Sequence, residues 1–448
     1  MFRARPVFRY GLACFLLATL MIGSCRLFPP HQLPFDATRD LTAELPVFPG
    51  AEGFGSTTIA GRGGDLIRVT NLNASGPGSL EAALTANGRR TVIFEVGGII
   101  ELSNSIHISD PYLTVAGQTA PSPGITLTGA GIVVGTHDVL IQHIRVRPGD
   151  TPDGEEAENR DGISVVGDRR GGTPVYNVVI DHCSVSWAID EGMSTWYEGV
   201  RDITFSNNLI AENLSESLHP KGEHSKGLLI GDHSRRISVI RNVFAHNMRR
   251  NPLLKGDTST IVANNLIYNG GTEAIGFSDP EWSGRSVATI VGNLFIPGTD
   301  SAGTEYVWRG RETSDEIELF LDSNLVDDGE LSEFLPSASI AEVAVGAPPV
   351  VVIPLTIEGT TDLEASVLES AGAFPADRDS VDARIVQSII DRSGAIIDSQ
   401  DDVDGYPAPT PSSRILTVPA DPSGDDDSDG YTNLEEWLHS FAFAAETP

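Results

Sequence analysis

The sequence Phe205-Ser-Asn-Asn208-Leu-Ile210 recurs downstream in varied form. Each copy is a short apolar strand, an Asn and another apolar pair. The Asn positions lie 34, 23, 28 and 31 residues apart by subtraction of their numbers. The sequences around Ile180 and Ile141 read as earlier copies without the Asn. The copies carry their Asn at positions Asn208, Asn242, Asn265, Asn293 and Asn324.

A period in this range is typical of solenoids and propellers. No Trp-Asp signature of a propeller recurs, and the strands are too short for a tandem array of β-sandwiches. Stacked coils explain the Asn column, because Asn tolerates the left-handed backbone of a sharp turn and its side chains can hydrogen-bond from coil to coil. We therefore predict an all-β parallel β-helix. The uneven spacing predicts loops of variable length on one side, where function is expected.

The composition suits a folded, acidic protein. The chain has 448 residues, is 40% hydrophobic and carries a formal net charge of -32. This charge argues against binding of nucleic acid or of anionic membranes by the folded body. A protein this acidic can bind a polyanion only through a locally cationic cleft.

The N-terminus reads as an export signal. A basic region with Arg3, Arg5 and Arg9 precedes an apolar run over residues 12–22, and the run ends in Ile22-Gly-Ser-Cys25, which is similar to a bacterial lipobox. We predict a lipoprotein signal peptide over residues 1–24, a lipid on Cys25 and a tether over residues 25–46. The protein would then be exported and lipid-anchored at the cell surface or outer membrane, with the lipid as its only membrane contact. The alternative is an ordinary cleaved signal peptide and a secreted protein.

Three acidic residues fall on neighbouring copies of the repeat. They are Asp161, Asp190 and Glu191. Clustered carboxylates repel one another unless a cation joins them or they share protons, and hard oxygen ligands suit Ca²⁺. A glycosidase with paired carboxylates is another functional interpretation. The non-functional interpretation is that surface carboxylates of an acidic protein lie near one another by chance.

Cations follow the acidic residues along the chain. Arg249 and Arg250 are adjacent and Lys255 comes soon after, a pattern that suits binding of carboxylates. Upstream, residues 219–227 hold two imidazoles together with Lys221 and Lys226. A zinc site there lacks an apparent third ligand, so we expect a substrate-facing loop.

Several motifs in one order are similar to those of bacterial pectate lyases of the first polysaccharide-lyase family. The resemblance covers residues 47–300. Its motifs are Phe48-Pro-Gly-Ala-Glu-Gly-Phe-Gly55, Gly61-Arg-Gly-Gly64, Val69-Thr-Asn-Leu-Asn73, Ala116-Gly-Gln-Thr-Ala-Pro121, Ile144-Arg-Val-Arg-Pro-Gly149 and Ile180-Asp-His-Cys183.

The resemblance implies a right-handed, single-stranded parallel β-helix and Ca²⁺-dependent β-elimination of polygalacturonate. It implies that Arg250 is the catalytic base, because Arg250 matches the first Arg of the family's Arg-x-Pro-x-x-Arg motif. Lys255 stands where the second Arg is expected, and it keeps the charge without the bidentate fork. Arg249, Lys226 and Lys255 would bind substrate. Lys221 is the preferred match to the family's substrate-facing lysine and is the easier base on first principles, with Lys226 as its competitor.

The resemblance also implies the metal ligands. Asp161 and Glu191 match two of the family's calcium carboxylates. A further acid is expected four residues after Glu191, but Thr195 stands there. Asp190 is therefore predicted as the substitute ligand.

A second calcium motif lies near the C-terminus. Acidic residues, a Gly at the sixth position and a final Glu match the spacing of an EF-hand loop, without an entering helix. We predict a β-helix domain over residues 47–420, irregular in its C-terminal part, and a single calcium-loop tail over residues 421–448. The predicted ligands are Asp425, Asp427, Asp429, Tyr431, Asn433 and Glu436.

The sequence leaves three functions open. The first is a Ca²⁺-dependent lyase that acts on polygalacturonate or a related acidic polysaccharide and is expected to be monomeric. The second is a β-helix glycoside hydrolase similar to polygalacturonases, or a lyase acting on another uronan. The third is a surface protein that captures polysaccharide without cleaving it.

Overall fold

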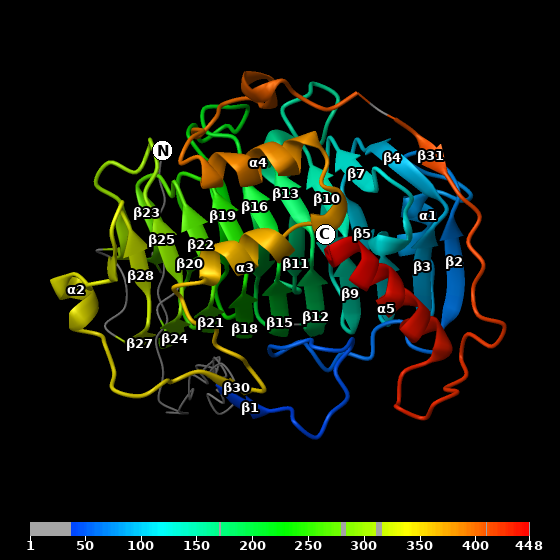
Figure 1. Cartoon of the computed structure of the whole chain (residues 1–448), viewed down its shortest axis with the longest axis horizontal. Helices are drawn as coiled ribbons and strands as arrows, with labels where there is room; N and C mark the ends of the chain where they lie inside the picture. Colours follow the sequence, from blue (N-terminus) through cyan, green and yellow to red (C-terminus); the bar gives the residue numbers. More distant parts are fainter. Residues whose placement is uncertain (1–36, 170–171, 279–283, 311–315, 409, 448) are drawn as a thin grey trace, which may run out of the picture. The chain divides into compact units, whose positions relative to one another are not determined.

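Successive chain segments form three parallel sheets that share one interior, as a computed structural model of the chain shows (Figure 1). It describes residues 37–169, 172–278, 284–310, 316–408 and 410–447. Most coils contain three strands, one from each sheet, and each strand pairs with its equivalent in the next coil. The predicted right-handed parallel β-helix is confirmed.

The ten-stranded sheet has parallel strands throughout. Its strands, in order, are β2 (Asp65–Val69), β3 (Arg90–Phe94), β6 (Leu113–Ala116), β9 (Val139–Gln142), β12 (Val175–Asp181), β15 (Val200–Ser206), β18 (Arg235–Ile240), β21 (Ser259–Ala263), β24 (Ser286–Val291) and β27 (Ile317–Asp322).

The eleven-stranded sheet is parallel except at its two ends, where β29 pairs antiparallel with β28 and β31 pairs antiparallel with β4. In order, it contains β29 (Leu331–Glu333), β28 (Leu325–Asp327), β25 (Leu294–Ile296), β22 (Leu266–Tyr268), β19 (Val243–Ala245), β16 (Leu209–Ala211), β13 (Ser184–Ser186), β10 (Ile144–Arg147), β7 (Ile125–Thr128), β4 (Val96–Glu101) and β31 (Ser412–Ser413).

The eight-stranded sheet follows the long loops of the coils. It contains β26 (Glu305–Arg309), β23 (Glu273–Phe277), β20 (Leu253–Leu254), β17 (Lys226–Ile230), β14 (Glu191–Trp196), β11 (Ile163–Val166), β8 (Ile132–Val134) and β5 (Ile106–Ile108). The inward side chains of all three sheets form one continuous apolar core. Helix α1 (Leu80–Leu84) adds Leu80 and Leu84 to this core beside β2 and β5.

The predicted Asn ladder is present at the turn between the ten- and eleven-stranded sheets. Asn265 Nδ2 donates to Asn293 Oδ1 at 2.9 Å, and its own Oδ1 accepts from Asn242 Nδ2 at 3.0 Å. The expected backbone role was wrong. The left-handed residue is the one before each ladder Asn, as at Asn207 and Arg241 with φ of 54° and 53°. The side chain of each ladder Asn instead forms hydrogen bonds with backbone groups of the turn and with the next ladder Asn.

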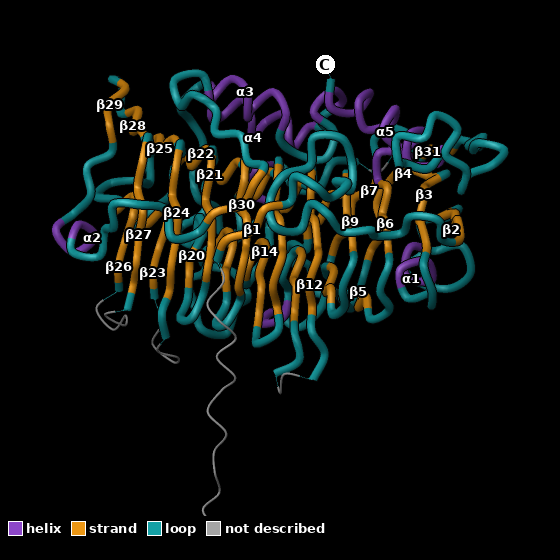
Figure 2. The backbone as a smooth tube through the Cα atoms, turned by 90° about the horizontal axis from the view of Figure 1, so that it is seen from below, coloured by secondary structure: helices purple, strands orange, loops and turns teal. Residues whose placement is uncertain are grey.

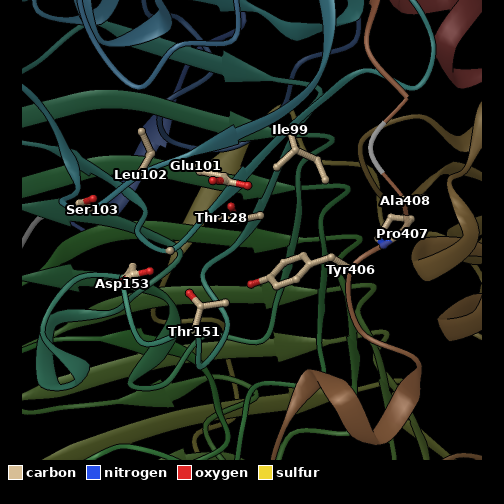
Figure 3. A pocket seen from close by; sticks show the side chains of 11 residues that line it. Ile99, Glu101, Leu102, Ser103, Thr128, Thr151, Asp153, Tyr406, Pro407 and Ala408 are labelled. Carbon is tan, nitrogen blue, oxygen red and sulfur yellow. The ribbon is translucent and has the colours of Figure 1, made fainter.

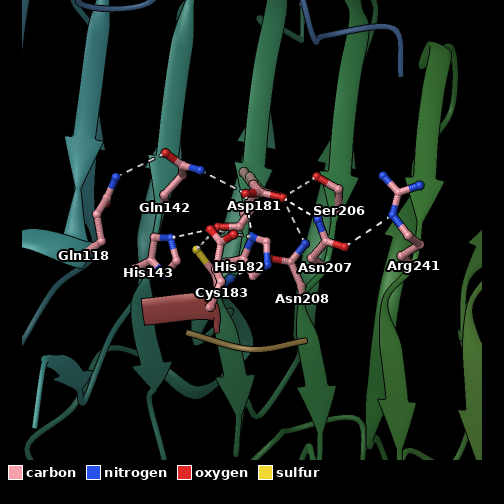
Figure 4. Close-up of polar contacts among 12 residues, drawn as sticks. Gln118, Gln142, His143, Asp181, His182, Cys183, Ser206, Asn207, Asn208 and Arg241 are labelled. Atoms are coloured by element: carbon pink, nitrogen blue, oxygen red, sulfur yellow. Dashed lines mark hydrogen bonds and ion pairs between the residues drawn. The ribbon is translucent and has the colours of Figure 1, made fainter. Parts of the chain in front are cut away.

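The coils before the ladder use a different polar cluster at this turn (Figure 4). Asp181 accepts hydrogen bonds from Gln142 Nε2 and Ser206 Oγ at 2.9 and 2.7 Å, and it contacts His182 Nδ1 at 2.7 Å. Burial alone would raise the pKa of Asp181, but these partners outweigh burial and lower it. Cys183 takes the ladder position beside Asn208 and is buried, which raises its pKa to about 12.

The C-terminal part, which was predicted to be irregular, contains helices that pack on the eleven-stranded sheet. Helices α3 (Leu363–Ser370) and α4 (Ser380–Ile390) bury apolar side chains against the outer face of this sheet (Figure 2). The polar residues Arg145 and Arg147 of β10 bind Asp382 of α4 at 3.0 and 2.7 Å. The smaller elements are α2 (Ala338–Ala341), η1 (Gly117–Thr119), η2 (Ala157–Asn159), η3 (Pro375–Asp377) and η4 (Gln400–Val403).

Two predicted boundaries need correction. The folded unit begins at residue 37, inside the predicted tether, because β1 (Thr38–Asp40) pairs with β30 (Val351–Ile353) and Leu41 is buried. The C-terminal tail is not separate either. Helix α5 (Asn433–Glu446) buries Leu434 and Leu438 against residues of the coils. The predicted signal peptide and Cys25 lie outside the described residues. Among the described helices, none has the length and apolar character to cross a membrane.

Candidate active site

Most of the predicted active-site residues lie together at the N-terminal ends of the strands of the eight-stranded sheet. Strand register places Glu191 of β14 beside Lys226 of β17, and Lys226 forms a bridge with Arg249 on the next coil. Asp161 precedes β11, whose Ile163 pairs with Met193. Consecutive coils therefore present two acidic positions and then two cationic positions along the axis of the helix.

The three predicted calcium carboxylates form one cluster. Asp161, Asp190 and Glu191 each offer an oxygen, and these oxygens lie within 4.8 Å of one another. Ser164 Oγ donates to Asp161 at 2.7 Å, and the backbone N–H of Glu191 donates to its other oxygen at 3.1 Å. These donors orient Asp161 toward Glu191.

Burial and mutual repulsion make this cluster electrostatically strained. Burial raises the pKa of Asp161 well above its usual range, and the charges of Glu191 and Asp190 raise it further. Burial also raises the pKa of Glu191, although Arg250 partly opposes this. A bound cation would relieve the repulsion between these two neighbouring carboxyl groups and so favour their ionised forms. The donor set therefore fits a hard divalent ion such as Ca²⁺.

Two cations already contact the cluster. Arg250 forms an ion pair with Glu191, and Lys226 Nζ lies 3.0 Å from Asp190 Oδ1 and 3.7 Å from Glu191 Oε1. Burial lowers the pKa of Lys226, and the nearby charge of Arg250 acts in the same direction. Asp190 differs from its neighbours. Burial would raise the pKa of Asp190, but His224 and Lys226 outweigh burial and hold it low.

The structure separates the predicted cations into those in the cluster and those outside it. Lys221 is exposed, and no described acidic group pairs with it, so the geometry favours Lys226 as the substrate-facing lysine. Arg249 lies at the edge of the cluster, 3.8 Å from Glu223. Lys255 follows β20, at the opposite end of that strand from Arg250, where it pairs with Asp232 at 2.7 Å and lies over the ring of Trp196.

Sequence reasoning missed the partners that hold these groups. His219 and His224 stack at 3.4 Å between ring centroids and face Asp190. Their loop was predicted to face substrate, but both side chains are buried. Nothing in the sequence pattern indicated that this loop closes over a carboxylate on the neighbouring coil.

A separate pocket of about 500 Å³ lies near the ends of β4 and β7. Tyr406 and Asp153 line it together with Glu101 and Thr128 (Figure 3). None of the predicted site residues lines this pocket, so we place the candidate active site at the carboxylate cluster and not here.

Three Asp side chains of the C-terminal loop converge. Oxygens of Asp425, Asp427 and Asp429 approach within 4.8 Å of one another. Desolvation and the charges of these Asp residues raise the pKa of Glu436. Glu435 instead pairs with Arg62 at 2.8 Å and thereby ties the start of α5 to the first coil.

A right-handed parallel β-helix that carries clustered carboxylates beside cations on one sheet is an arrangement suited to enzymes that cleave acidic polysaccharides. The comparisons narrow the class. The chain is 33% identical over 431 residues to a protein of Aspergillus flavus named probable pectate lyase C, covering 89% of this chain and 94% of that protein. It is 34% identical over 451 residues to the protein of the same name from Neosartorya fischeri, covering 93% and 98%. The chain belongs to the pectate lyase family and is a polysaccharide lyase.

Solved structures agree on the fold. The cedar pollen allergen jun a 1 aligns with a TM-score of 0.53 at 22% identity, covering 72% of this chain and 92% of the allergen. The thermostable pectate lyase PL 47 aligns with a TM-score of 0.53 at 15% identity, covering 74% and 98%. No family model matches the chain. At these identities the structures support the β-helix alone.

Proposed function

We propose that the protein cleaves α-1,4-linked polygalacturonate by Ca²⁺-dependent β-elimination at the cluster of Asp161, Glu191, Lys226 and Arg250. The observation that carries this proposal is the juxtaposition of three converging carboxylates with two cations on the next coils. One side can hold a divalent cation, and the other can bind the carboxylate of a uronate. Relatives named probable pectate lyase C support the substrate.

The chemistry assigns a role to each residue. Asp161, Asp190 and Glu191 would hold the Ca²⁺, which when bound supplies positive charge next to the carboxylate of the substrate. Lys226 and Arg249 would bind that same carboxylate and stabilise the negative charge that develops on it. Arg250 would accept the proton from C5, the C5–H electrons would form the C4–C5 double bond, and the bond from C4 to the glycosidic oxygen would break. The departing oxygen then takes a proton, which leaves one unsaturated uronide end.

Variants of the cations test these assignments by ultraviolet absorbance of the unsaturated product. Arg250→Ala should lose most of the activity, because no other group replaces the base. Lys221→Ala is the matched cation control and should keep near-full activity, because the side chain of Lys221 is exposed and outside the cluster. Near-full activity of Arg250→Ala together with an inactive Lys221→Ala would refute the assignment.

Addition of a chelator tests the class of reaction. Lyase activity on polygalacturonate should disappear and return with Ca²⁺. Products without unsaturated ends that persist in chelator would indicate a hydrolase, and binding without any product would indicate a capture protein. The same assay on a panel of other uronans tests the substrate.

We also propose a second Ca²⁺ site in the C-terminal loop, held by Asp425, Asp427, Asp429, Tyr431, Asn433 and Glu436. The EF-hand spacing and the convergent Asp oxygens support it. Because Glu435 and α5 attach this loop to the first coil, its role would be to stabilise the C-terminal segment. In a calcium titration, the Asp427→Ala variant should bind one Ca²⁺ fewer than the unaltered protein. It should keep its lyase activity.

We propose that the protein is exported and anchored by a lipid on Cys25, acting as a monomer at the cell surface. The basic and apolar N-terminal region with its Cys supports this. Mass spectrometry of the N-terminus tests it. A mature chain that begins at an unmodified residue other than Cys25 would indicate ordinary secretion.

A further inference from the structure

The loop between β16 and β17 closes over Asp190. The backbone N–H of Leu214 donates to Ala188 at 2.9 Å, and those of His224 and Ser225 donate to Ser215 and Leu214 at 3.0 and 2.8 Å. These bonds pinch the base of the loop shut. As a result, the rings of two loop histidines are stacked and buried next to the candidate active site.

Both rings aim their Nε2 atoms at one carboxylate. His224 Nε2 lies 3.2 Å from Asp190 Oδ1, and His219 Nε2 lies 3.7 Å from Asp190 Oδ2. Both Nε2 atoms are buried, and neither makes a hydrogen bond to a described group, so each depends on its ion-pair contact with Asp190. A buried polar atom without a partner is costly, so the two rings depend on Asp190 as much as it depends on them.

The opposite ring nitrogens are held by the backbone of the loop. His219 Nδ1 accepts a hydrogen bond from the N–H of Lys221 at 3.2 Å, so a neutral His219 carries its proton on Nε2 and presents it to Asp190. His224 Nδ1 lies 2.9 Å from the carbonyl oxygen of Gly222, which can only accept, so this nitrogen carries a proton. The loop therefore fixes the orientation of both rings.

Asp190 transmits this constraint to Lys226. Its Oδ1 atom lies 3.0 Å from Lys226 Nζ, and the lysine side chain is buried beside Glu191 and Arg250. A lysine side chain has many rotamers and does not stay in one of them unless a partner holds it. Neither histidine has a polar route to Arg250 or Glu191 except through Asp190 and Lys226 among the contacts described.

We propose that His219 and His224 are positioning residues that hold Asp190 and, through it, fix Lys226 toward the carboxylate of a bound uronate. The part that concerns substrate rests on the proposed lyase function. The part that concerns Lys226 does not, because it is a statement about how this chain orders its own side chain.

Amine labelling of Lys226, followed by mass spectrometry, tests the proposal without any substrate. In His224→Ala, we expect Lys226 to react about tenfold faster, because the buried polar contact that holds its partner Asp190 is lost. Lys221 is the internal control in the same spectra, because it is already exposed and should react at an unchanged rate. His219→Gln keeps a donor and an acceptor and should leave Lys226 protected. Unchanged labelling of Lys226 in His224→Ala would overturn the proposal.

Kinetics on polygalacturonate provide the second arm. His224→Ala should raise KM about tenfold, and added imidazole should restore part of the loss, whereas Lys226→Ala should not respond to imidazole. The double variant Asp190→Asn with His224→Ala should be no worse than Asp190→Asn alone, since the histidine acts through Asp190. Additive losses would overturn the proposal. Faster labelling in a protein that makes no unsaturated product would refute the lyase function and leave the positioning role standing.

Discussion

Asp161→Asn should change the stability of the protein in opposite directions with and without calcium. The oxygens of Asp161, Asp190 and Glu191 lie within 4.8 Å of one another. Two unit charges at that separation repel by about 3 kcal/mol at an effective dielectric constant of about 20. Arg250 and Lys226 offset part of this repulsion, so we expect the calcium-free variant to gain about 1 kcal/mol of unfolding free energy.

With calcium the order should reverse. A ligand that binds only the folded state at 100 times its Kd adds about 2.7 kcal/mol of stability, and Asp161→Asn should lose this contribution from the active site. The assay is thermal or denaturant unfolding, with chelator and with saturating Ca²⁺. All proteins compared should carry Asp427→Ala, so that the C-terminal loop does not contribute. A variant that is less stable in chelator, or that keeps the full calcium effect, would refute the reasoning.

Two other predictions follow from the same structure. Asn265→Leu should lower the unfolding free energy by about 3 kcal/mol or more, because it leaves the buried backbone N–H of Asn242 without a partner and removes the bonds that Asn265 Nδ2 donates to Asn293 Oδ1 and to the carbonyl oxygen of Val239. The exposed Asn104→Leu is the control, and equal unfolding curves would contradict the ladder's role. In calcium-free buffer the protein should lose stability as the pH rises, because the raised pKa values of Asp161 and Glu191 mean that the folded state binds more protons than the unfolded state above their ordinary range. A stability that rises over that interval would show that Arg250 and Lys226 already neutralise the cluster.

The sequence was sufficient for the coils because each coil repeats the same local requirement. The Asn column could be read directly, since the ladder hydrogen bonds join equivalent positions of successive copies. The backbone detail could not be read, because both Asn207 and Asn208 suit a left-handed turn. Only the three-dimensional turn shows that Asn207 takes that conformation and Asn208 forms the ladder.

The site was predictable where it follows strand register and not where it depends on loops. Glu191 and Lys226 are neighbours because their strands pair in register. Lys221 was preferred over Lys226 on sequence alone, since both lie in one Gly-containing loop. In the structure the base of the loop is closed by backbone hydrogen bonds, Lys221 is exposed and Lys226 contacts Asp190, and this difference favours Lys226. Such long-range closure leaves no periodic trace in the sequence.

The charge of the cleft suggests why a protein with a net charge of -32 would need a divalent cation to bind a polyanion. The expectation of a locally cationic cleft needs revision, because three of its cations are paired with acids: Lys226 with Asp190, Arg250 with Glu191, and Lys255 with Asp232. When all three cluster carboxylates are ionised, they outnumber the two cations that contact them. The ionised cluster therefore repels a uronate, and a bound divalent cation reverses the sign. In this arrangement calcium would govern whether substrate binds at all, which predicts that chelation raises KM before it affects anything else.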